Sequence, residues 1–179
     1  MSFKRTIALI IILVALGTYF YLWEVRGTSK SLKEEEVERI FPSDKEDVEE
    51  VELIRGSEII RCRKTNKGWQ ITAPFEASDI DDVMSDLLSD VGNAVMIEVI
   101  DTNPSNLADY GLDRPRMGLS LKFKDDPTPK TLLLGDSNPN RTCIYAKFED
   151  LPEVILVGSL LKHDLETGIF ALKQKCPKS

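Results

Sequence analysis

The chain begins with a long stretch of apolar residues, and the polar and apolar positions alternate only later. Residues 6–23 carry no charged side chain. As a helix rising about 1.5 Å per residue, this stretch would span about 27 Å, close to the thickness of the hydrocarbon core of a bilayer. Basic residues precede it and aromatic residues crowd its far end, as at membrane interfaces: Lys4, Arg5, Tyr19, Tyr21 and Trp23. The pattern predicts an N-terminal tail and a single transmembrane helix in residues 1–23.

A cleaved signal peptide is the alternative interpretation of this segment. Ala15-Leu16-Gly17 offers small residues at the relative positions of a cleavage site. The apolar run continues beyond this point to Trp23, and cleavage would leave it exposed, which favours a retained anchor. The basic tail before the span favours a cytoplasmic N-terminus. We therefore expect a single-pass protein of a bacterial inner membrane, with its C-terminal domain in the periplasm or otherwise outside the cytoplasm.

Small residues interrupt the bulky side chains of the predicted anchor. Ala15, Gly17 and Thr18 could form a notch in which another transmembrane helix packs closely. The alternative is that these residues face lipid. The notch is therefore a candidate helix-packing site, and its partner would be another membrane protein.

The remainder of the chain divides into a polar stalk over residues 24–47, a domain over residues 48–170 and a C-terminal tail over residues 171–179. Period-two alternation and short apolar runs separated by turn residues predict strands. The predicted strands lie around residues 48–53, 58–63, 69–72, 95–99, 119–123, 131–134, 143–148 and 154–157. A short closing helix is expected over residues 159–165.

The clearest helix in the pattern begins at Ser78. Its hydroxyl and the carboxylate of Asp81 have the spacing of a capping box. Apolar residues then recur on one face and aspartates on the other, which predicts a buried stripe and a solvated face. The stripe consists of Ile80, Val83, Met84, Leu87, Leu88 and Val91. Strands and helices do not alternate regularly, so the expected fold is α+β, with a largely antiparallel sheet and one main amphipathic helix.

Composition limits the chemistry that this chain can perform. With 23 basic and 30 acidic side chains, the formal net charge is −7, which disfavours nucleic acid as a partner. His163 is the single histidine, and no pair of cysteines has the spacing of a zinc site. The sequence shows no activated nucleophile and no phosphate-binding glycine loop. We expect a protein that is not an enzyme, with no metal and no cofactor.

Cysteines are the remaining reactive groups. Cys62 and Cys143 lie on predicted strands and could form a disulfide in an oxidising compartment, or they could be free buried thiols. Cys176 lies in the predicted tail, where we expect it to be exposed.

Several short motifs occur in a recognisable order. They are Gly68-Trp69-Gln70-Ile71 with Pro74, Tyr110-Gly111-Leu112 with Pro115, Leu133-Leu134-Gly135-Asp136, Asn138-Pro139, Tyr145-Ala146 and Val154-Ile155-Leu156-Val157. Together with the predicted anchor, residues 48–166 resemble the bacterial family called domain of unknown function 4340, found beside genes for ABC transporters of the gliding-motility type. The resemblance implies a membrane-tethered extracytoplasmic domain associated with transport systems, and it implies no catalytic residues.

The motif residues have structural interpretations. Gly111 and Gly135 fit positions that require a positive φ. Trp69 fits a core anchor, and alternatively it could line a groove with Tyr110 or Tyr145.

Two functions are therefore expected from the sequence. The first is a non-enzymatic accessory or scaffold subunit of an envelope complex, associated with an ABC transporter. The alternative is a module that binds a glycan, lipid or small solute in the groove formed by Trp69, Tyr110 or Tyr145.

Overall fold

The computed structural model describes residues 38–41 and 45–176. The predicted anchor, its Ala15, Gly17 and Thr18 notch, and most of the predicted stalk lie outside the described residues. Within the described residues, no helix has both the length and the apolar character needed to cross a membrane.

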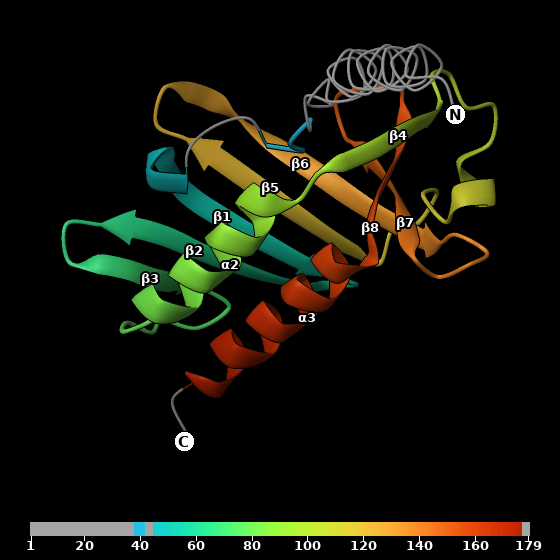
Figure 1. The fold of residues 1–179 in the computed structure, drawn as a ribbon. Helices are drawn as coiled ribbons and strands as arrows, with labels where there is room; N and C mark the ends of the chain where they lie inside the picture. Colours follow the sequence, from blue (N-terminus) through green and yellow to red (C-terminus); the bar gives the residue numbers. More distant parts are fainter. Residues whose placement is uncertain (1–37, 42–44, 177–179) are drawn as a thin grey trace, which may run out of the picture. The chain divides into compact units, whose positions relative to one another are not determined.

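One sheet of eight strands forms the framework of the domain (Figure 1). The strands are β1 (Val48–Arg55), β2 (Glu58–Thr65), β3 (Gly68–Ala73), β4 (Met96–Asp101), β5 (Met117–Phe123), β6 (Asp126–Ser137), β7 (Cys143–Phe148) and β8 (Val154–Gly158). Their order across the sheet is β3-β2-β1-β5-β6-β7-β8-β4, and every neighbouring pair is antiparallel. The expected antiparallel α+β fold and its eight strands are confirmed.

Two helices, α2 (Asp81–Asn93) and α3 (Ser159–Gln174), contact each other and cover one face of this sheet (Figure 1). Two short 3₁₀ helices, η1 (Lys45–Asp47) and η2 (Leu107–Tyr110), precede β1 and β5. The domain thus has a second long helix in addition to the one main helix expected.

The predicted start of α2 at Ser78 is wrong. Asp79 has a φ of 60°, which is incompatible with a right-handed helix, and α2 begins at Asp81 without a side-chain cap. Two acidic residues, Asp81 and Asp82, occupy the first turn, where the helix dipole favours negative charge. The carboxylate of Asp81 accepts a hydrogen bond from the backbone N–H of Trp69 at 2.9 Å, so it joins the helix to β3.

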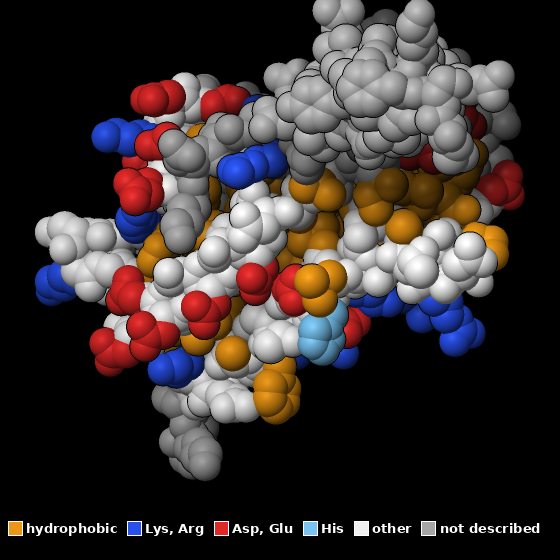
Figure 2. Space-filling view, viewed as in Figure 1, with side chains coloured by type: hydrophobic (Ala, Val, Ile, Leu, Met, Phe, Trp, Pro, Cys, Tyr) orange, Lys and Arg blue, Asp and Glu red, His pale blue; other side chains and the backbone are white. Residues whose placement is uncertain are grey.

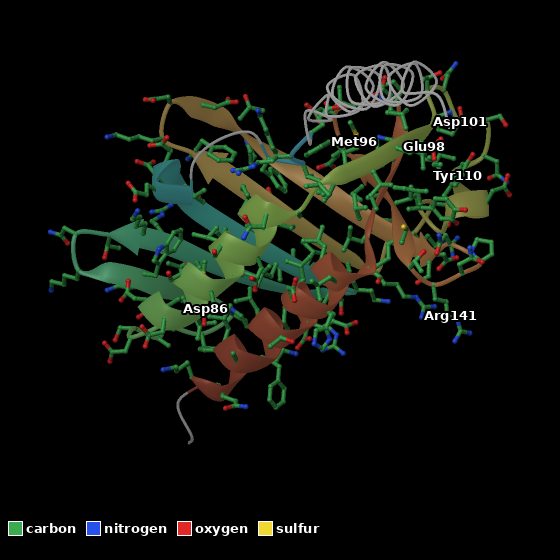
Figure 3. The ribbon with its side chains drawn as sticks, in the orientation of Figure 1. Asp86, Met96, Glu98, Asp101, Tyr110 and Arg141 are labelled. Atoms are coloured by element: carbon green, nitrogen blue, oxygen red, sulfur yellow. The ribbon has the colours of Figure 1, made fainter. Side chains whose placement is uncertain are left out.

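The outer face of α2 is acidic. Asp82, Asp86 and Asp90 of α2 are exposed, as is Asp79 just before the helix, and acidic side chains follow this helix in the space-filling view (Figure 2). Asp86 lies on the solvent side of α2 in Figure 3. The expected solvated face is confirmed.

Helix α3 is longer than the segment expected over residues 159–165. Its buried residues recur at helical spacing well past Leu165: Leu161, Leu165, Gly168, Ile169 and Leu172. A Cβ atom on Gly168 would lie 3.0 Å from Leu87 of α2, so this glycine allows the two helices to approach closely. Because the stripe continues to Leu172, the helix includes part of the predicted tail.

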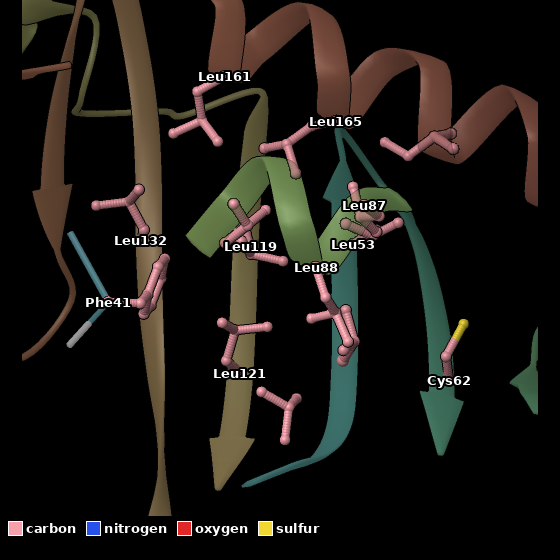
Figure 4. Packing of buried hydrophobic residues seen from close by; sticks show 14 of the residues in the cluster. Phe41, Leu53, Cys62, Leu87, Leu88, Leu119, Leu121, Leu132, Leu161 and Leu165 are labelled. Atoms are coloured by element: carbon pink, nitrogen blue, oxygen red, sulfur yellow. The ribbon is translucent and has the colours of Figure 1, made fainter. Parts of the chain in front are cut away.

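The core lies between the sheet and the two helices (Figure 4). In this view Leu53, Leu119 and Leu121 of the central strands face Leu88 of α2 and Leu165 of α3. Each buried leucine side chain of this kind contributes roughly 1.5–3 kcal/mol through removal of apolar surface from water. The α2 stripe is buried at Ile80, Met84, Leu87, Leu88 and Val91, with Val83 partly buried.

The domain begins earlier than expected. Its compact unit starts at Glu38, and Ile40 and Phe41 are buried in the core. The ring of Phe41 packs edge-on against Phe148 of β7, with 5.6 Å between the ring centroids. Glu38 to Phe41 therefore belong to the domain and not to the polar stalk in which the sequence analysis placed them.

Candidate functional site

Strand β4 is one edge of the sheet, and its backbone is the basis of the candidate site. On one side it pairs with β8, where Val99 lies opposite Ile155. On the other side, the N–H of Met96 donates to the carbonyl of Glu38 at 2.8 Å. Within the described residues, no segment continues this outer pairing beyond Met96. Among the described residues, the outer backbone edge of residues 97–101 therefore has no pairing partner.

Three apolar side chains of β4 are exposed. Ile97 is 52% exposed, Val99 38% and Ile100 39%. Glu98 is also exposed, and Figure 3 shows it beyond Met96 along the strand. An edge strand with several exposed β-branched side chains differs from most edge strands, which charged residues or proline protect from pairing.

A polar corner forms the end of β4. The hydroxyl of Tyr110 donates a hydrogen bond to Oδ2 of Asp101 at 3.1 Å, and both residues lie together at the end of the strand in Figure 3. The ring of Tyr110 packs edge-on against Tyr145 of β7, with centroids 5.2 Å apart. Burial and the adjacent Asp101 carboxylate raise the pKa of the Tyr110 hydroxyl, so it remains a neutral donor at physiological pH. The hydrogen bond between Tyr110 and Asp101 therefore holds the C-terminal end of β4 against η2.

Trp69 lies far from this corner. It is 6% exposed, in the core, on β3 at the opposite edge of the sheet. Four strands separate β3 from the β7 strand that carries Tyr145. The structure brings Tyr110 and Tyr145 together but does not place Trp69 beside either of them, so it forms no groove from all three residues.

The family of the chain follows from sequence comparison. A family model described as domain of unknown function (DUF4340) matches residues 69–177. The chain belongs to this family. No curated protein and no solved structure gives a significant match. The match starts at Trp69 and continues through α3, so β1 and β2 precede the matched part of the domain. The matched range therefore lies further toward the C-terminus than the resemblance expected over residues 48–166.

Two of the DUF4340 motifs meet in space: Tyr110-Gly111-Leu112 and Leu133-Leu134-Gly135-Asp136. Gly111, which follows η2, has a φ of 67°, as expected from the sequence. Gly135 on β6 is not among the glycines with positive φ, so the predicted reason for this glycine is wrong. A Cβ atom there would collide with the carbonyl oxygen of Tyr110, and one on Gly111 would lie 2.5 Å from Asp136. The two motifs are therefore a packing contact between η2 and β6.

The predicted cysteine pair of the DUF4340 domain cannot form a disulfide. Cys62 lies on β2 and Cys143 on β7, with β1, β5 and β6 between them. At about 4.8 Å per strand the separation is roughly 19 Å, whereas a disulfide requires Cα atoms within about 7 Å. Cys62 is buried, and this burial raises the pKa of its thiol to about 12.

The other candidate groups have structural roles. Oδ1 of Asp101 accepts a hydrogen bond from the backbone N–H of Asn103 at 3.0 Å, which forms a turn. His163 is exposed on α3. In the described part of the chain, no group of three His, Cys, Asp or Glu side chains is placed to hold a metal ion.

The exposure of the β4 side chains was not predicted from the sequence. The alternation of Val95, Ile97 and Val99 predicted a strand, and such alternation usually marks one buried face. One signal could have identified an edge strand. In Met96–Asp101 the apolar residues do not keep to alternate positions, because Ile100 is apolar in addition to Ile97 and Val99. The position of β4 at the edge depends on its pairing with the distant strand β8, which a local pattern does not specify.

Proposed function

We propose that this protein is a non-enzymatic, membrane-anchored accessory or scaffold subunit of a bacterial envelope complex associated with an ABC transporter. In this proposal, residues 6–23 hold the chain in the inner membrane and the DUF4340 domain lies outside the cytoplasm. The domain binds a partner protein through the outer edge of β4. The anchor and the transporter association rest on the sequence pattern and the family resemblance.

The observation that carries the proposal is the unprotected edge of β4. Its outer backbone groups are free of pairing partners among the described residues from Ile97 to Asp101, and the exposed side chains of Ile97, Val99 and Ile100 flank them. Adding a strand to such an edge gives main-chain hydrogen bonds for affinity and side-chain contacts for specificity. The edge therefore fits an extended segment of another protein.

Charge indicates which strand would fit. Within Met96–Asp101 the charged residues are Glu98 and Asp101, both acidic. A second copy of β4 would bring further acidic residues to an edge that has no basic side chain to balance them, and like charges across strands are destabilising. A partner strand that alternates apolar residues with lysine or arginine would balance these charges. We therefore favour a basic partner strand over a homodimer.

The experiment is purification of the full-length protein from native membranes in a mild detergent. A photo-cross-linking residue in place of Glu98 should capture one partner in stoichiometric amount, and mass spectrometry should locate the cross-link in an extended segment that contains lysine or arginine. Ile97→Lys should abolish this product, because it places a charge in the apolar contact and repels a basic strand. Leu160→Lys is the matched control, since Leu160 is an exposed apolar residue on α3 and is 67% exposed.

Three outcomes would contradict the proposal. They are a monomer without a cross-linked partner, a partner lost equally in the Ile97→Lys and Leu160→Lys variants, and a cross-link to a second copy of the chain. A monomer that carries a bound small molecule would instead favour the ligand-binding module expected as the alternative.

A further inference from the structure

An open cleft lies between the β1–β2 turn, the chain before β5, strand β6 and helix α3. Its volume is about 1150 Å³, and its lining differs in charge from the rest of the chain. The whole chain has an acidic excess, whereas the cleft is lined by five basic side chains and four acidic ones. A basic excess on an acidic protein is a local feature that favours an anion at this place.

Three arginines belong to the cleft and approach it from the end of β1 and from the chain before β5. Arg55 ends β1 and lies opposite Met117 of β5 in the sheet register. The N–H of Gly56 donates to the carbonyl of Arg116 at 2.7 Å, which fixes the turn after β1 against the chain before β5. Arg114 is two residues before Arg116, and all three arginines line the cleft. The backbone therefore places three guanidinium groups around one opening.

Arg114 and Arg116 form no ion pair among the described residues, whereas Arg55 lies opposite Glu58 in the β1–β2 register and its charge helps to lower the pKa of that carboxyl. The ion pairs among the described residues join Arg61 to Glu52, Arg63 and Lys122 to Glu50, and Lys173 to Glu58. Only the Lys173–Glu58 pair belongs to the cleft. This ion pair joins one of the basic side chains of the cleft to one of its acidic side chains. The hydrogen bond from Lys173 and the charge of Lys173 lower the pKa of Glu58. In the described part of the chain, Arg55, Arg114 and Arg116 thus have no carboxylate within ion-pair distance.

We infer that this cleft binds a small multivalent oxyanion, with phosphate or carboxylate groups on the guanidinium groups of Arg55, Arg114 and Arg116. Guanidinium groups bind both kinds of oxyanion through paired hydrogen bonds, which makes arginine the preferred residue for such recognition. The volume is in the range of small-molecule sites and exceeds what a single phosphate would fill. Asp113, Asp136 and Glu166 on the same lining can accept hydrogen bonds from hydroxyl or ammonium groups of the ligand. The inference is independent of the proposed β4 partner.

The test uses the full-length protein in a non-ionic detergent and titrates it with sodium pyrophosphate by isothermal calorimetry. We expect saturable binding that weakens as the salt concentration rises. The double variant Arg114→Gln/Arg116→Gln should weaken binding at least tenfold. A double variant Arg141→Gln/Lys124→Gln removes the same charge from exposed residues outside the cleft lining, and its affinity should change less than threefold. Circular dichroism of each variant monitors folding.

A second arm distinguishes a free anion from a lipid headgroup. The same titration is repeated with detergent micelles that contain phosphatidylglycerol, and phosphatidylcholine micelles serve as the reference. Competition between phosphatidylglycerol and pyrophosphate would assign the cleft to an anionic headgroup, whereas pyrophosphate binding unaffected by the lipid would assign it to a soluble oxyanion. Absence of saturable binding to both probes, or equal losses in the cleft and control variants, would overturn the inference.

Discussion

Gly135 of β6 lies so close to Tyr110 that a methyl group at position 135 would collide with the Tyr110 carbonyl oxygen. The same Cβ atom would lie 2.9 Å from Cγ of Leu112. A backbone atom and a buried leucine cannot move aside as the end of a flexible side chain can. The contact between β6 and the segment after η2 therefore requires a glycine, and Tyr110 depends on it for its position beside Asp101.

Gly135→Ala should destabilise the domain by about 3 kcal/mol or more, because overpacking here displaces backbone. Chemical denaturation of the full-length chain, followed by circular dichroism, measures the effect. Gly92→Ala is the matched control, since Gly92 lies in α2 and a Cβ atom there has no neighbour within 4 Å. Alanine at this helical position should stabilise by roughly 0.5–1 kcal/mol. Equal stability of the two variants would contradict the packing role of Gly135.

The start of α2 offers a second test. Asp81 accepts a hydrogen bond from the N–H of Trp69, whereas Ser78 lies before the helix and α2 has no side-chain cap. Asp81→Ala should cost about 1–2 kcal/mol of unfolding free energy, because the Trp69 donor loses a charged acceptor. Ser78→Ala should change it by less than about 0.5 kcal/mol. Thermal or chemical unfolding measures both variants. A larger loss of stability in Ser78→Ala than in Asp81→Ala would support the capping box that the sequence predicted.

Local patterns predicted the elements of this fold well, and the limits of that prediction have physical causes. Alternating and helical periodicity identified all eight strands and the buried stripe of α2, because these periods arise directly from backbone geometry. The predicted helix start was wrong because Asp79 adopts a φ of 60°, and its carbonyl accepts a hydrogen bond from the side chain of Lys175, which directly follows α3. A capping motif read along the chain contains no information about such a distant partner.

The candidate site was predictable only in part for the same reason. Tyr110 and Tyr145 were singled out and do meet, because both belong to motifs that pack at one corner of the sheet. Trp69 was grouped with them although β3 is at the other edge, and Cys62 was paired with Cys143 across three intervening strands. Strand order is decided by long-range pairing, as when β1 inserts between β2 and β5. No single-sequence pattern specifies it.

Stability should also depend on pH through Asp164 of α3. Burial first, and the nearby charge of Asp90 second, raise the pKa of the Asp164 carboxyl, while His163 opposes this shift. At neutral pH, folding therefore forces a charged carboxylate into an unfavourable position. As the pH falls through the raised folded-state pKa, the folded protein takes up a proton first and this cost disappears.

Asp164→Asn should accordingly stabilise the domain at pH 7 by less than about 1 kcal/mol, since the site is partly solvated. The gain should shrink as the pH falls and vanish below about 3.8, the ordinary value of an aspartate. Thermal unfolding measured from pH 7 to pH 3.5 tests this course. Asp86→Asn on the exposed face of α2 is the control and should show no such gain. A gain that grows toward low pH would contradict the assignment.

The last prediction concerns the reactivity of Cys62. Burial raises the pKa of this thiol to about 12, compared with 9.0 for a free thiol. At pH 8 only about one thiol in ten thousand would be ionised, and the thiolate is the species that reacts with alkylating reagents. In the native protein, Cys62 should therefore react with iodoacetamide about a thousandfold more slowly than in the same protein unfolded in urea, with each site quantified by mass spectrometry. Mild oxidation of the folded protein should yield no Cys62–Cys143 cross-link, because three strands lie between the two residues. Rapid native labelling of Cys62 would show that β2 opens readily at the core, and an intramolecular cross-link would contradict the strand order itself.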